Sequence, residues 1–149
     1  MGTILIVDDH LDRAIPLLRL LRRSGHAAAC VSDGASALGM LAGPDDATRP
    51  NLVLLDVMMP DMDGTEVLRR IRSDPRIAST PVVMHTAISD PTFRDHVMGL
   101  GANDYWVKCS LDFDEMQRRM GELLDASAAT AAASVFTTRT TTANECPAS

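Results

Sequence analysis

The sequence predicts an α/β fold, in which a doubly wound parallel sheet of five strands carries helices on both faces. The first observation is a strict alternation of five short apolar segments with five stretches of helical periodicity. The second is that segments 3–7 and 51–55 are apolar at consecutive positions, which is typical of strands buried on both faces of a parallel sheet. Because parallel strands need long crossovers, the helices between them fit the same fold.

The predicted strands are short, and the second is weak because it consists mostly of alanine. They cover residues 3–7, 27–31, 51–55, 81–85 and 104–107. The first helix is predicted from the spacing of Leu11, Ile15 and Leu18, with Gly25 just beyond its end. Pro16 disagrees with this pattern, because a proline inside the helix would lose a backbone hydrogen bond unless the helix effectively begins around it.

The remaining helices have recognisable start signals. Asp33 and Ser110 are the predicted N-caps of the second and fifth helices. Asp90 followed by Pro91 predicts the start of the fourth, since proline is favoured in the first helical turn. The third helix is predicted to begin at Thr65, after a turn in which Gly64 takes a positive φ.

Composition indicates one globular domain followed by a different tail. The chain has 149 residues, of which 46% are hydrophobic and 23% charged. Residues 126–149 are mostly alanine, threonine and serine. We therefore expect a folded domain over residues 1–124 and a mostly disordered tail over 125–149, with the alanine run 128–133 extending the last helix by a turn or so.

Charge and cysteine content narrow the functional classes. The net charge of −6 disfavours nucleic acid as a partner, and no apolar run is long enough to span a membrane. The N-terminus lacks the features of a secretory signal. The three cysteines are widely spaced and indicate neither a disulfide framework nor a zinc site. The cytoplasm is therefore the predicted location.

Candidate functional side chains follow four of the five predicted strands. Asp8 and Asp9 come after the first, Asp56 after the third, Thr86 after the fourth and Lys108, the single lysine of the chain, after the fifth. In open parallel sheets, ligands bind beyond the carboxyl ends of the strands. Three carboxylates gathered there would repel one another unless a cation lay among them, and Mg²⁺ favours such oxygen ligands. This arrangement suggests transfer of a phosphoryl group to Asp56 as the nucleophile.

Four segments together resemble the receiver domain of two-component response regulators, over residues 2–124. They are ILIVDD (4–9), LLDVMMPDMDG (54–64), TA (86–87) and GANDYWVK (101–108), in the family's order and spacing. The resemblance implies a flavodoxin-like sheet with strand order 2-1-3-4-5. It also implies a stand-alone response regulator that is not an enzyme, apart from catalysing its own phosphorylation and dephosphorylation.

The resemblance also assigns a role to each site residue. Asp56 would accept the phosphoryl group from the phosphohistidine of a sensor histidine kinase or a histidine phosphotransfer protein. Asp9, Asp56 and the backbone carbonyl of Met58 would bind Mg²⁺ directly, and Asp8 would help through water.

Three further residues would respond to the phosphoryl group. Lys108 would pair with it, Thr86 would donate a hydrogen bond to one of its oxygens, and Tyr105 would be the aromatic side chain that changes rotamer with Thr86. The face formed by the fourth helix, fifth strand and fifth helix would then bind a downstream protein or a second copy of the chain. No nucleic acid or membrane is expected as a partner.

Several positions depart from the family pattern or have more than one interpretation. Cys109 replaces the usual proline after the lysine, and we expect the peptide bond between Lys108 and Cys109 to be trans, because a cis bond without proline costs about 2.5–4 kcal/mol. Met58 and Ile88 occupy the positions that tune phosphate lifetime, and both would exclude water. His10 is close enough in sequence to touch the site, whereas His85 is expected to be a satisfied core or interface histidine.

Two other functions compete with this interpretation. Asp61 to Thr65 reads DxDGT, which resembles the nucleophile loop of haloacid-dehalogenase-type phosphatases. That motif normally follows a buried strand directly, whereas here the predicted strand ends at Asp56. The second alternative is a receiver fold that acts only as an interaction module and is not phosphorylated.

Overall fold

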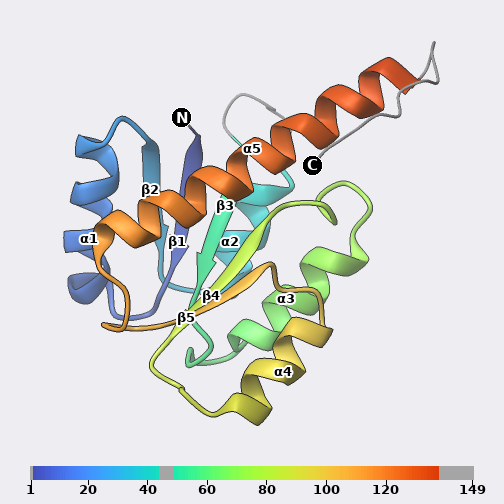
Figure 1. Cartoon of the computed structure of the whole chain (residues 1–149). Coiled ribbons are helices and arrows are strands. Elements are labelled where there is room, and N and C mark those ends of the chain that lie inside the picture. Colours follow the sequence, from blue (N-terminus) through green and yellow to red (C-terminus); the bar gives the residue numbers. More distant parts are fainter. Residues whose placement is uncertain (1, 44–48, 138–149) are drawn as a thin grey trace.

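The computed structural model describes residues 2–43 and 49–137, with side chains described up to residue 126. It contains the predicted five-stranded parallel sheet, with strand order β2-β1-β3-β4-β5 (Figure 1). The strands are β1 (Thr3–Val7), β2 (Ala27–Val31), β3 (Leu52–Leu55), β4 (Val82–Thr86) and β5 (Asp104–Val107). The helices are α1 (Leu11–Arg23), α2 (Gly34–Leu41), α3 (Gly64–Ser73), α4 (Pro91–Gly99) and α5 (Phe113–Thr137).

The sheet is covered on both faces, which gives the molecule two hydrophobic cores. One core joins alternate residues of β1, such as Leu5 and Val7, to side chains of α2, α3 and α4. The other joins Ile4 and Ile6 to side chains of α1 and α5. Side chains alternate across a strand, so consecutive apolar residues supply both cores. Burial on both faces of the sheet therefore explains the continuous apolar runs from which the fold was predicted.

Helix α1 begins at Leu11 and runs through Pro16, so the proline lies inside the helix. Pro16 is exposed, so its ring lies away from the core. The end of α1 agrees with the prediction, because Gly25 has φ of 96° and donates a hydrogen bond to the carbonyl of Arg22. His26 donates to the carbonyl of Leu21, which completes a Schellman motif.

Two of the predicted helix starts are confirmed. The carboxylate of Asp33 accepts a hydrogen bond from the backbone N–H of Ser36, and that of Asp90 accepts one from Thr92. Pro91 is the first residue of α4. In both helices a short side chain satisfies an N–H group that has no partner within the helix.

The other two starts differ from the prediction. Asp63 caps α3, which begins at Gly64 and not at Thr65. Helix α5 is capped by Asp112, which accepts from the N–H of Glu115 at 2.8 Å, whereas the hydroxyl of Ser110 donates to Val107.

The turn before α3 also differs. Gly64 does not have a positive φ; the residue that does is Asp61, at 67°. A carboxyl side chain tolerates this backbone region better than most side chains do.

The alanine run 128–133 lies within α5, which extends to Thr137 and thus exceeds the predicted extra turn. Residues 138–149 of the predicted tail lie outside the described residues. Within the described part of the chain, no helix is long and apolar enough to span a membrane.

Candidate functional site

The carboxyl ends of the strands bring the predicted site residues together. In the sheet register Val7 is paired with Leu55, and Thr86 with Val107, so Asp8 and Asp56 leave neighbouring strands at the same level. The backbone supports this edge, because the N–H of Asp56 donates to the carbonyl of Val7 at 2.9 Å.

Lys108 holds two of the carboxylates. Its Nζ lies 2.7 Å from Oδ2 of Asp8 and 3.1 Å from Oδ2 of Asp56. Both aspartates are only 5% exposed, so the ammonium group compensates for two nearly buried negative charges. Burial opposes the charge of Lys108, but the hydrogen bond to Asp8 and the attraction of Asp56 outweigh it, and the pKa of Lys108 is raised.

Asp56 is also oriented by the loop that follows it. Its Oδ1 accepts hydrogen bonds from the backbone N–H groups of Val57 at 2.8 Å and of Met58 at 3.4 Å. The loop returns so closely that a Cβ at Gly64 would lie 2.2 Å from the backbone oxygen of Asp56. Glycine is therefore required at position 64 by close approach and not by φ.

Asp8, Asp9 and His10 form a cluster of potential metal ligands. One donor atom from each lies within 4.8 Å of the others. Oδ1 of Asp9 is buried and makes no hydrogen bond, although Nδ1 of His10 is 3.1 Å away. A buried carboxylate oxygen without a donor is a suitable ligand for a hard cation, so the residues present fit Mg²⁺. Asp56 is not one of these three and is connected to them through Lys108.

A small pocket opens over Asp56. Its volume is about 150 Å³, and it is lined by side chains from several strand ends and from the start of α1. The lining residues are His10, Arg13, Asp56, Met58, Thr86, Ala87 and Lys108. Arg13 was not anticipated, because its sequence position marks it only as a helix surface residue. Met58 is 63% exposed, which places this residue at the rim of the pocket.

Thr86 and Tyr105 are connected through the backbone of Ile88. The hydroxyl of Thr86, a fully buried residue, accepts from the N–H of Ile88 at 3.3 Å. The hydroxyl of Tyr105 donates to the carbonyl of Ile88 at 2.6 Å. Burial, with a contribution from Asp90, raises the pKa of Tyr105, so the phenol stays a donor at neutral pH. The next residue, Trp106, packs in the core under α1 and α5.

The loop after β5 has the predicted trans peptide bond between Lys108 and Cys109. Cys109 itself has φ of 66°, in the left-handed region that few residues other than glycine, asparagine and aspartate adopt. The change from proline to cysteine is therefore accompanied by an unusual backbone conformation directly beside the site.

The two aspartates of the DxDGT motif lie apart from this constellation. Asp61 is exposed in the loop after β3, and Asp63 caps α3, where the hydroxyl of Thr65 also donates to it at 2.6 Å. These contacts and the backbone hydrogen bond from Glu66 hold the pKa of Asp63 below its ordinary value, even though partial burial opposes them. The residue directly after the buried strand is Asp56.

Comparison with known proteins identifies the family of this chain. The sensory transduction protein RegX3 of Mycobacterium tuberculosis is 41% identical over 110 residues, which are 72% of this chain and 44% of RegX3. The DNA-binding response regulator MtrA of Mycobacterium leprae is 42% identical over 107 residues, 70% of this chain and 44% of MtrA. The chain thus spans less than half the length of these curated relatives.

A solved structure has the same fold. The response regulator receiver domain protein (CheY-like) from Methanospirillum hungatei superposes with a TM-score of 0.75 at 23% identity, covering 87% of this chain and 98% of that one. The family model described as the response regulator receiver domain matches residues 4–121. The chain therefore belongs to the response regulator receiver domain family of two-component signal transduction.

Proposed function

We propose that this chain accepts a phosphoryl group on Asp56, in a Mg²⁺-dependent reaction, and signals through altered binding of a partner. The donor is the phosphohistidine of a sensor histidine kinase or of a histidine phosphotransfer protein. The single observation that carries this proposal is Lys108, whose Nζ lies 3.1 Å from Asp56 and 2.7 Å from Asp8 at the carboxyl edge of the sheet. Membership of the receiver family supports it.

The metal would be held directly by Asp9, Asp56 and the backbone carbonyl of Met58, and Asp8 would help through water. The unpartnered Oδ1 of Asp9 supports this assignment. When bound, Mg²⁺ supplies positive charge that stabilises the oxygens of the transferred group. His10 lies close enough to add a further contact in this cluster.

The chain's own residues orient and stabilise the reacting groups. A carboxylate oxygen of Asp56 attacks phosphorus, the bond from phosphorus to the imidazole nitrogen breaks, and the released histidine takes up a proton. Backbone N–H groups of Val57 and Met58 fix the attacking carboxylate through its other oxygen. Lys108 gains a phosphoryl oxygen as partner, and Arg13 at the pocket lining adds a second cation for the incoming donor.

The response begins at Thr86. When the side chain moves so that its hydroxyl donates to a phosphoryl oxygen, the hydroxyl oxygen moves away from the N–H of Ile88, from which it accepts at 3.3 Å. The carbonyl of Ile88 accepts from the hydroxyl of Tyr105, so a shift of Ile88 alters the environment of this aromatic ring. The face formed by α4, β5 and α5 then changes and binds a downstream protein or a second copy of the chain.

Other aspects of the proposal follow from the relatives. MtrA is named as a DNA-binding regulator, so the acidic charge of the present chain does not exclude nucleic acid among the partners of a receiver of this kind. The division into a receiver over residues 1–124 and a tail over 125–149, the action as a stand-alone regulator and the location in the cytoplasm stay predictions. The chain is proposed to catalyse only its own phosphorylation and dephosphorylation.

The test is phosphorylation by a small donor. The full chain is incubated with Mg²⁺ and acetyl phosphate, and intact mass is measured. We expect the mass of one phosphoryl group to be gained by the wild type and by Asp61→Asn, and to be absent in Asp56→Asn. No gain in the wild type would favour the interaction module. Gain lost only in Asp61→Asn, with turnover of p-nitrophenyl phosphate, would favour the phosphatase.

We predict that the phosphorylated chain is long-lived. Met58 lines the pocket over Asp56 with a side chain that cannot orient an attacking water, and Ile88 next to Thr86 cannot do so either. The measurement is loss of phosphate from purified phosphorylated protein in Mg²⁺ alone. Met58→Asn should shorten the lifetime, because an amide can hold a water near phosphorus. A wild-type label that disappears within seconds would contradict the prediction.

A further inference from the structure

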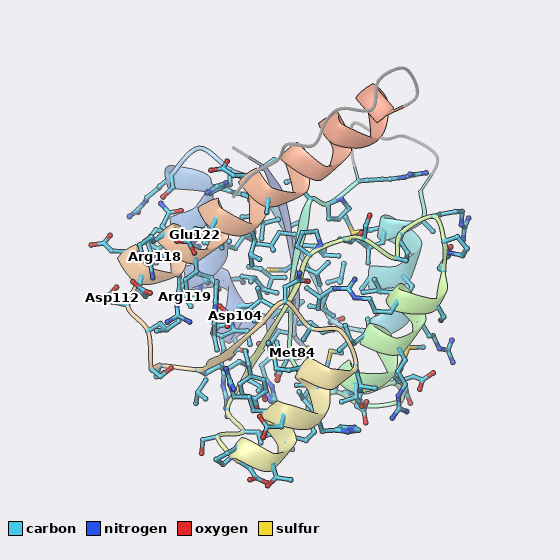
Figure 2. All side chains as sticks on the ribbon, turned by 45° about the vertical axis from the view of Figure 1, so that its right-hand side comes forward. Met84, Asp104, Asp112, Arg118, Arg119 and Glu122 are labelled. Atoms are coloured by element: carbon cyan, nitrogen blue, oxygen red, sulfur yellow. The ribbon has the colours of Figure 1, made fainter. Side chains whose placement is uncertain are left out.

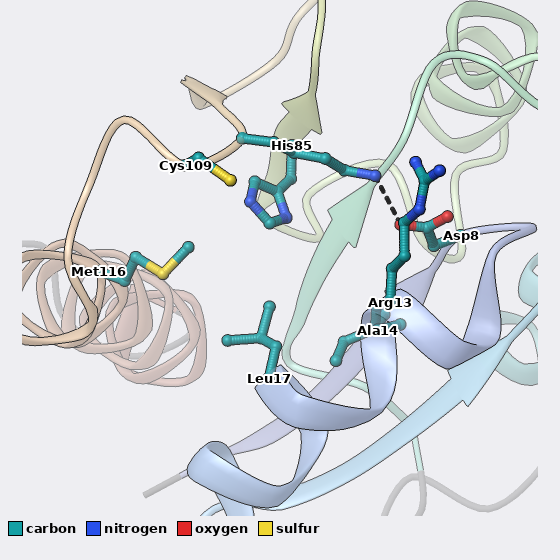
Figure 3. Close-up of a pocket in the computed structure, with 9 residues that line it drawn as sticks. Asp8, Arg13, Ala14, Leu17, His85, Cys109 and Met116 are labelled. Carbon is teal, nitrogen blue, oxygen red and sulfur yellow. Dashed lines mark hydrogen bonds and ion pairs between the residues drawn. The ribbon is translucent and has the colours of Figure 1, made fainter.

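A second pocket lies on the other side of β4 from the Asp56 pocket. It has a volume of about 200 Å³ between α1, the end of β4, the loop after β5 and the start of α5 (Figure 3). Apolar side chains, Leu17 among them, form much of its wall, and Lys108 and Asp8 lie at the end nearest the Asp56 pocket. The cationic side chain of Arg13 also lines the wall. Three other side chains of the wall carry atoms that can bind a soft metal ion: His85, Cys109 and Met116.

His85 is not satisfied by the protein around it, contrary to the expectation from sequence. Among the described residues neither ring nitrogen makes a hydrogen bond, and the ring packs against Trp106 in a T-shaped arrangement, with centroids 6.3 Å apart. Burial, together with the nearby charge of Lys108, lowers the pKa of His85 to about 4, against the opposing influence of Asp8 and Asp56. The imidazole is therefore neutral at physiological pH and offers a nitrogen lone pair to the pocket.

Cys109 and Met116 bring two sulfur atoms to the same space. Cys109 lies on the left-handed turn after β5, and in Figure 3 its thiol lies beside the imidazole of His85. Met116 is 8% exposed, on the first turns of α5, and its thioether points toward the same cavity. The three donors come from three separate elements, and only the fold brings them together.

We propose that His85, Cys109 and Met116 form a binding site for a soft monovalent metal ion, Cu(I), separate from the Mg²⁺ site. Thiolate and thioether sulfur select Cu(I), and imidazole suits copper as well. One thiolate neutralises the charge of Cu(I), so binding adds no positive charge to a pocket whose wall already carries Lys108 and Arg13. Cys109 is exposed, so its thiol is accessible to an incoming ion. A divalent ion would leave a net positive charge beside Lys108, and the nearest carboxylate, Asp8, is already engaged by that lysine.

The binding step needs no oxidant or reductant. The thiol of Cys109 loses its proton to solvent as the copper–sulfur bond forms, and Cu(I) keeps its oxidation state. Because His85 and Cys109 directly adjoin Thr86 and Lys108, an occupied site restrains both residues, and we expect slower phosphorylation of Asp56. This last expectation rests on the proposed function, whereas the metal site does not.

The experiment uses the full chain with Cys30→Ala and Cys146→Ala, which leaves Cys109 as its single thiol. Under anaerobic conditions it competes with a chromophoric chelator for Cu(I), and Ag(I) serves as a redox-inert second probe. We expect one equivalent to bind and to quench Trp106, the single tryptophan of the chain and the neighbour of His85. Asp56→Asn in the same background should bind equally well, which separates this site from phosphorylation.

Single substitutions identify the ligands. Cys109→Ala should abolish binding, and His85→Gln and Met116→Leu should each weaken it by at least about tenfold, since even indirect partners of metal ligands cost that much. The matched control is Met120→Leu, a buried methionine one turn further along α5, which should bind as the background does. If His85→Gln and Met116→Leu both bound Cu(I) with unaltered affinity, the thiol of Cys109 would be the only ligand, and the proposal would be overturned. A site that binds Cu(I) without slowing phosphorylation would overturn the coupling and leave the site intact.

Discussion

Three residues at the strand ends depend on very local physical constraints. Lys108 compensates for two carboxylates, each 5% exposed, Gly64 allows a backbone approach that no other residue permits, and His85 stays neutral because charging it inside the fold is costly. None of these constraints involves more than a few neighbouring groups. Each can therefore be tested by one substitution with a control of the same chemical type.

Gly64→Ala should damage the phosphoacceptor loop. A Cβ there would lie 2.2 Å from the backbone oxygen of Asp56 and 2.8 Å from Cα of Val57, so the backbone must shift. We expect a loss of about 1–3 kcal/mol in the free energy of unfolding, as for other overpacked sites, together with slower phosphorylation of Asp56. The measurement is urea denaturation combined with the mass assay.

The matched control is Gly121→Ala in α5, where an added Cβ meets nothing within 4 Å. Alanine is favoured over glycine in a helix interior, so this variant should gain up to about 1 kcal/mol. Equal effects of the two substitutions would contradict the role of close approach at Gly64.

His85 should make the fold less stable in mild acid. Its pKa is about 4 in the folded chain and near 6.5 when unfolded, so between these values the unfolded chain binds a proton that the folded chain does not. The free energy of unfolding therefore falls as pH drops from about 6.5 to 4 and loses no more on this account below 4, with roughly 3 kcal/mol as the full effect. Lys108, Asp8 and Asp56 contribute to this environment.

The check is urea denaturation across this pH range without added metal. His85→Leu should have a flatter dependence than the wild type, and the exposed His96→Gln of α4 should keep the wild-type slope. Parallel curves for His85→Leu and the wild type would show that the histidine binds its proton equally well in the folded and the unfolded chain.

At the scale of elements, the connections are held by side chains that no motif marks. Arg72 at the end of α3 donates four hydrogen bonds to oxygen atoms of two loops. Its Nε donates to the carbonyl of Gly101 at 2.9 Å, and its Nη2 donates to Oδ1 of Asn103 at 2.8 Å. Its Nη1 donates to the carbonyls of Ala78 at 3.0 Å and Thr80 at 2.7 Å. These partners lie in the loops before β4 and β5. The guanidinium group therefore joins α3 to the entrances of two strands, and burial lowers its pKa because every partner is a neutral oxygen.

Arg72→Lys should destabilise the fold although charge is preserved. An ammonium cannot reproduce the planar arrangement of donors, so buried carbonyls lose their partners at a cost of about 1–3 kcal/mol. Arg70→Lys, whose arginine makes only an exposed pair with Glu66 at 2.9 Å, should change stability by less than about 1 kcal/mol. Chemical denaturation at pH 7 measures the free energy of unfolding of both variants. An Arg72→Lys variant as stable as the wild type would contradict the role of these hydrogen bonds.

Charged side chains also connect the start of α5 to the rest of the molecule. Arg118 and Arg119 both pair with Glu115, and Arg118 also reaches Glu122 (Figure 2). Hydrogen bonds from the two arginines lower the pKa of the half-buried Glu115 to about 2. Arg119 also lies 3.4 Å from Asp104 of β5, whose carboxylate accepts from the indole N–H of Trp106. These contacts attach the start of α5 to β5 at the sheet edge.

At the scale of the whole molecule, the sheet supports a cluster of like charges at one edge. Asp8, Asp9 and Asp56 cost stability wherever their negative charges are not balanced, and Lys108 balances only part of them. The two cores on the faces of the sheet offset this loss of stability, because they bury apolar side chains from all five helices. A bound dication should return stability to the entire fold.

Mg²⁺ should therefore raise the melting temperature. At a concentration of 100 times its dissociation constant, the ion adds about 2.7 kcal/mol to the free energy of unfolding, measured against NaCl at equal ionic strength. Asp9→Asn should lose most of this gain, because it removes the unpartnered ligand oxygen. The exposed Asp12→Asn should retain it. No shift in melting temperature or in tryptophan fluorescence of the wild type would contradict a metal site at this edge.

The sequence by itself determined the parallel fold and the place of the site. Its alternating apolar and helical segments specify strand and helix, and a polar residue that ends a parallel strand must lie at the carboxyl edge, whatever the packing. For the same reason Asp8, Asp56, Thr86 and Lys108 were predictable as neighbours. Caps at Asp33 and Asp90 were also predictable, since they depend on contacts within three residues.

Tertiary structure decided what depends on contacts between distant residues. Gly64 is required because the loop returns to Asp56, α1 tolerates Pro16 because that face is exposed, and Arg72 reaches loops up to 31 residues away in sequence. The grouping of His85, Cys109 and Met116 around one pocket belongs to the same class. Local sequence patterns do not predict these contacts, because the contacts form only when separate elements pack against one sheet.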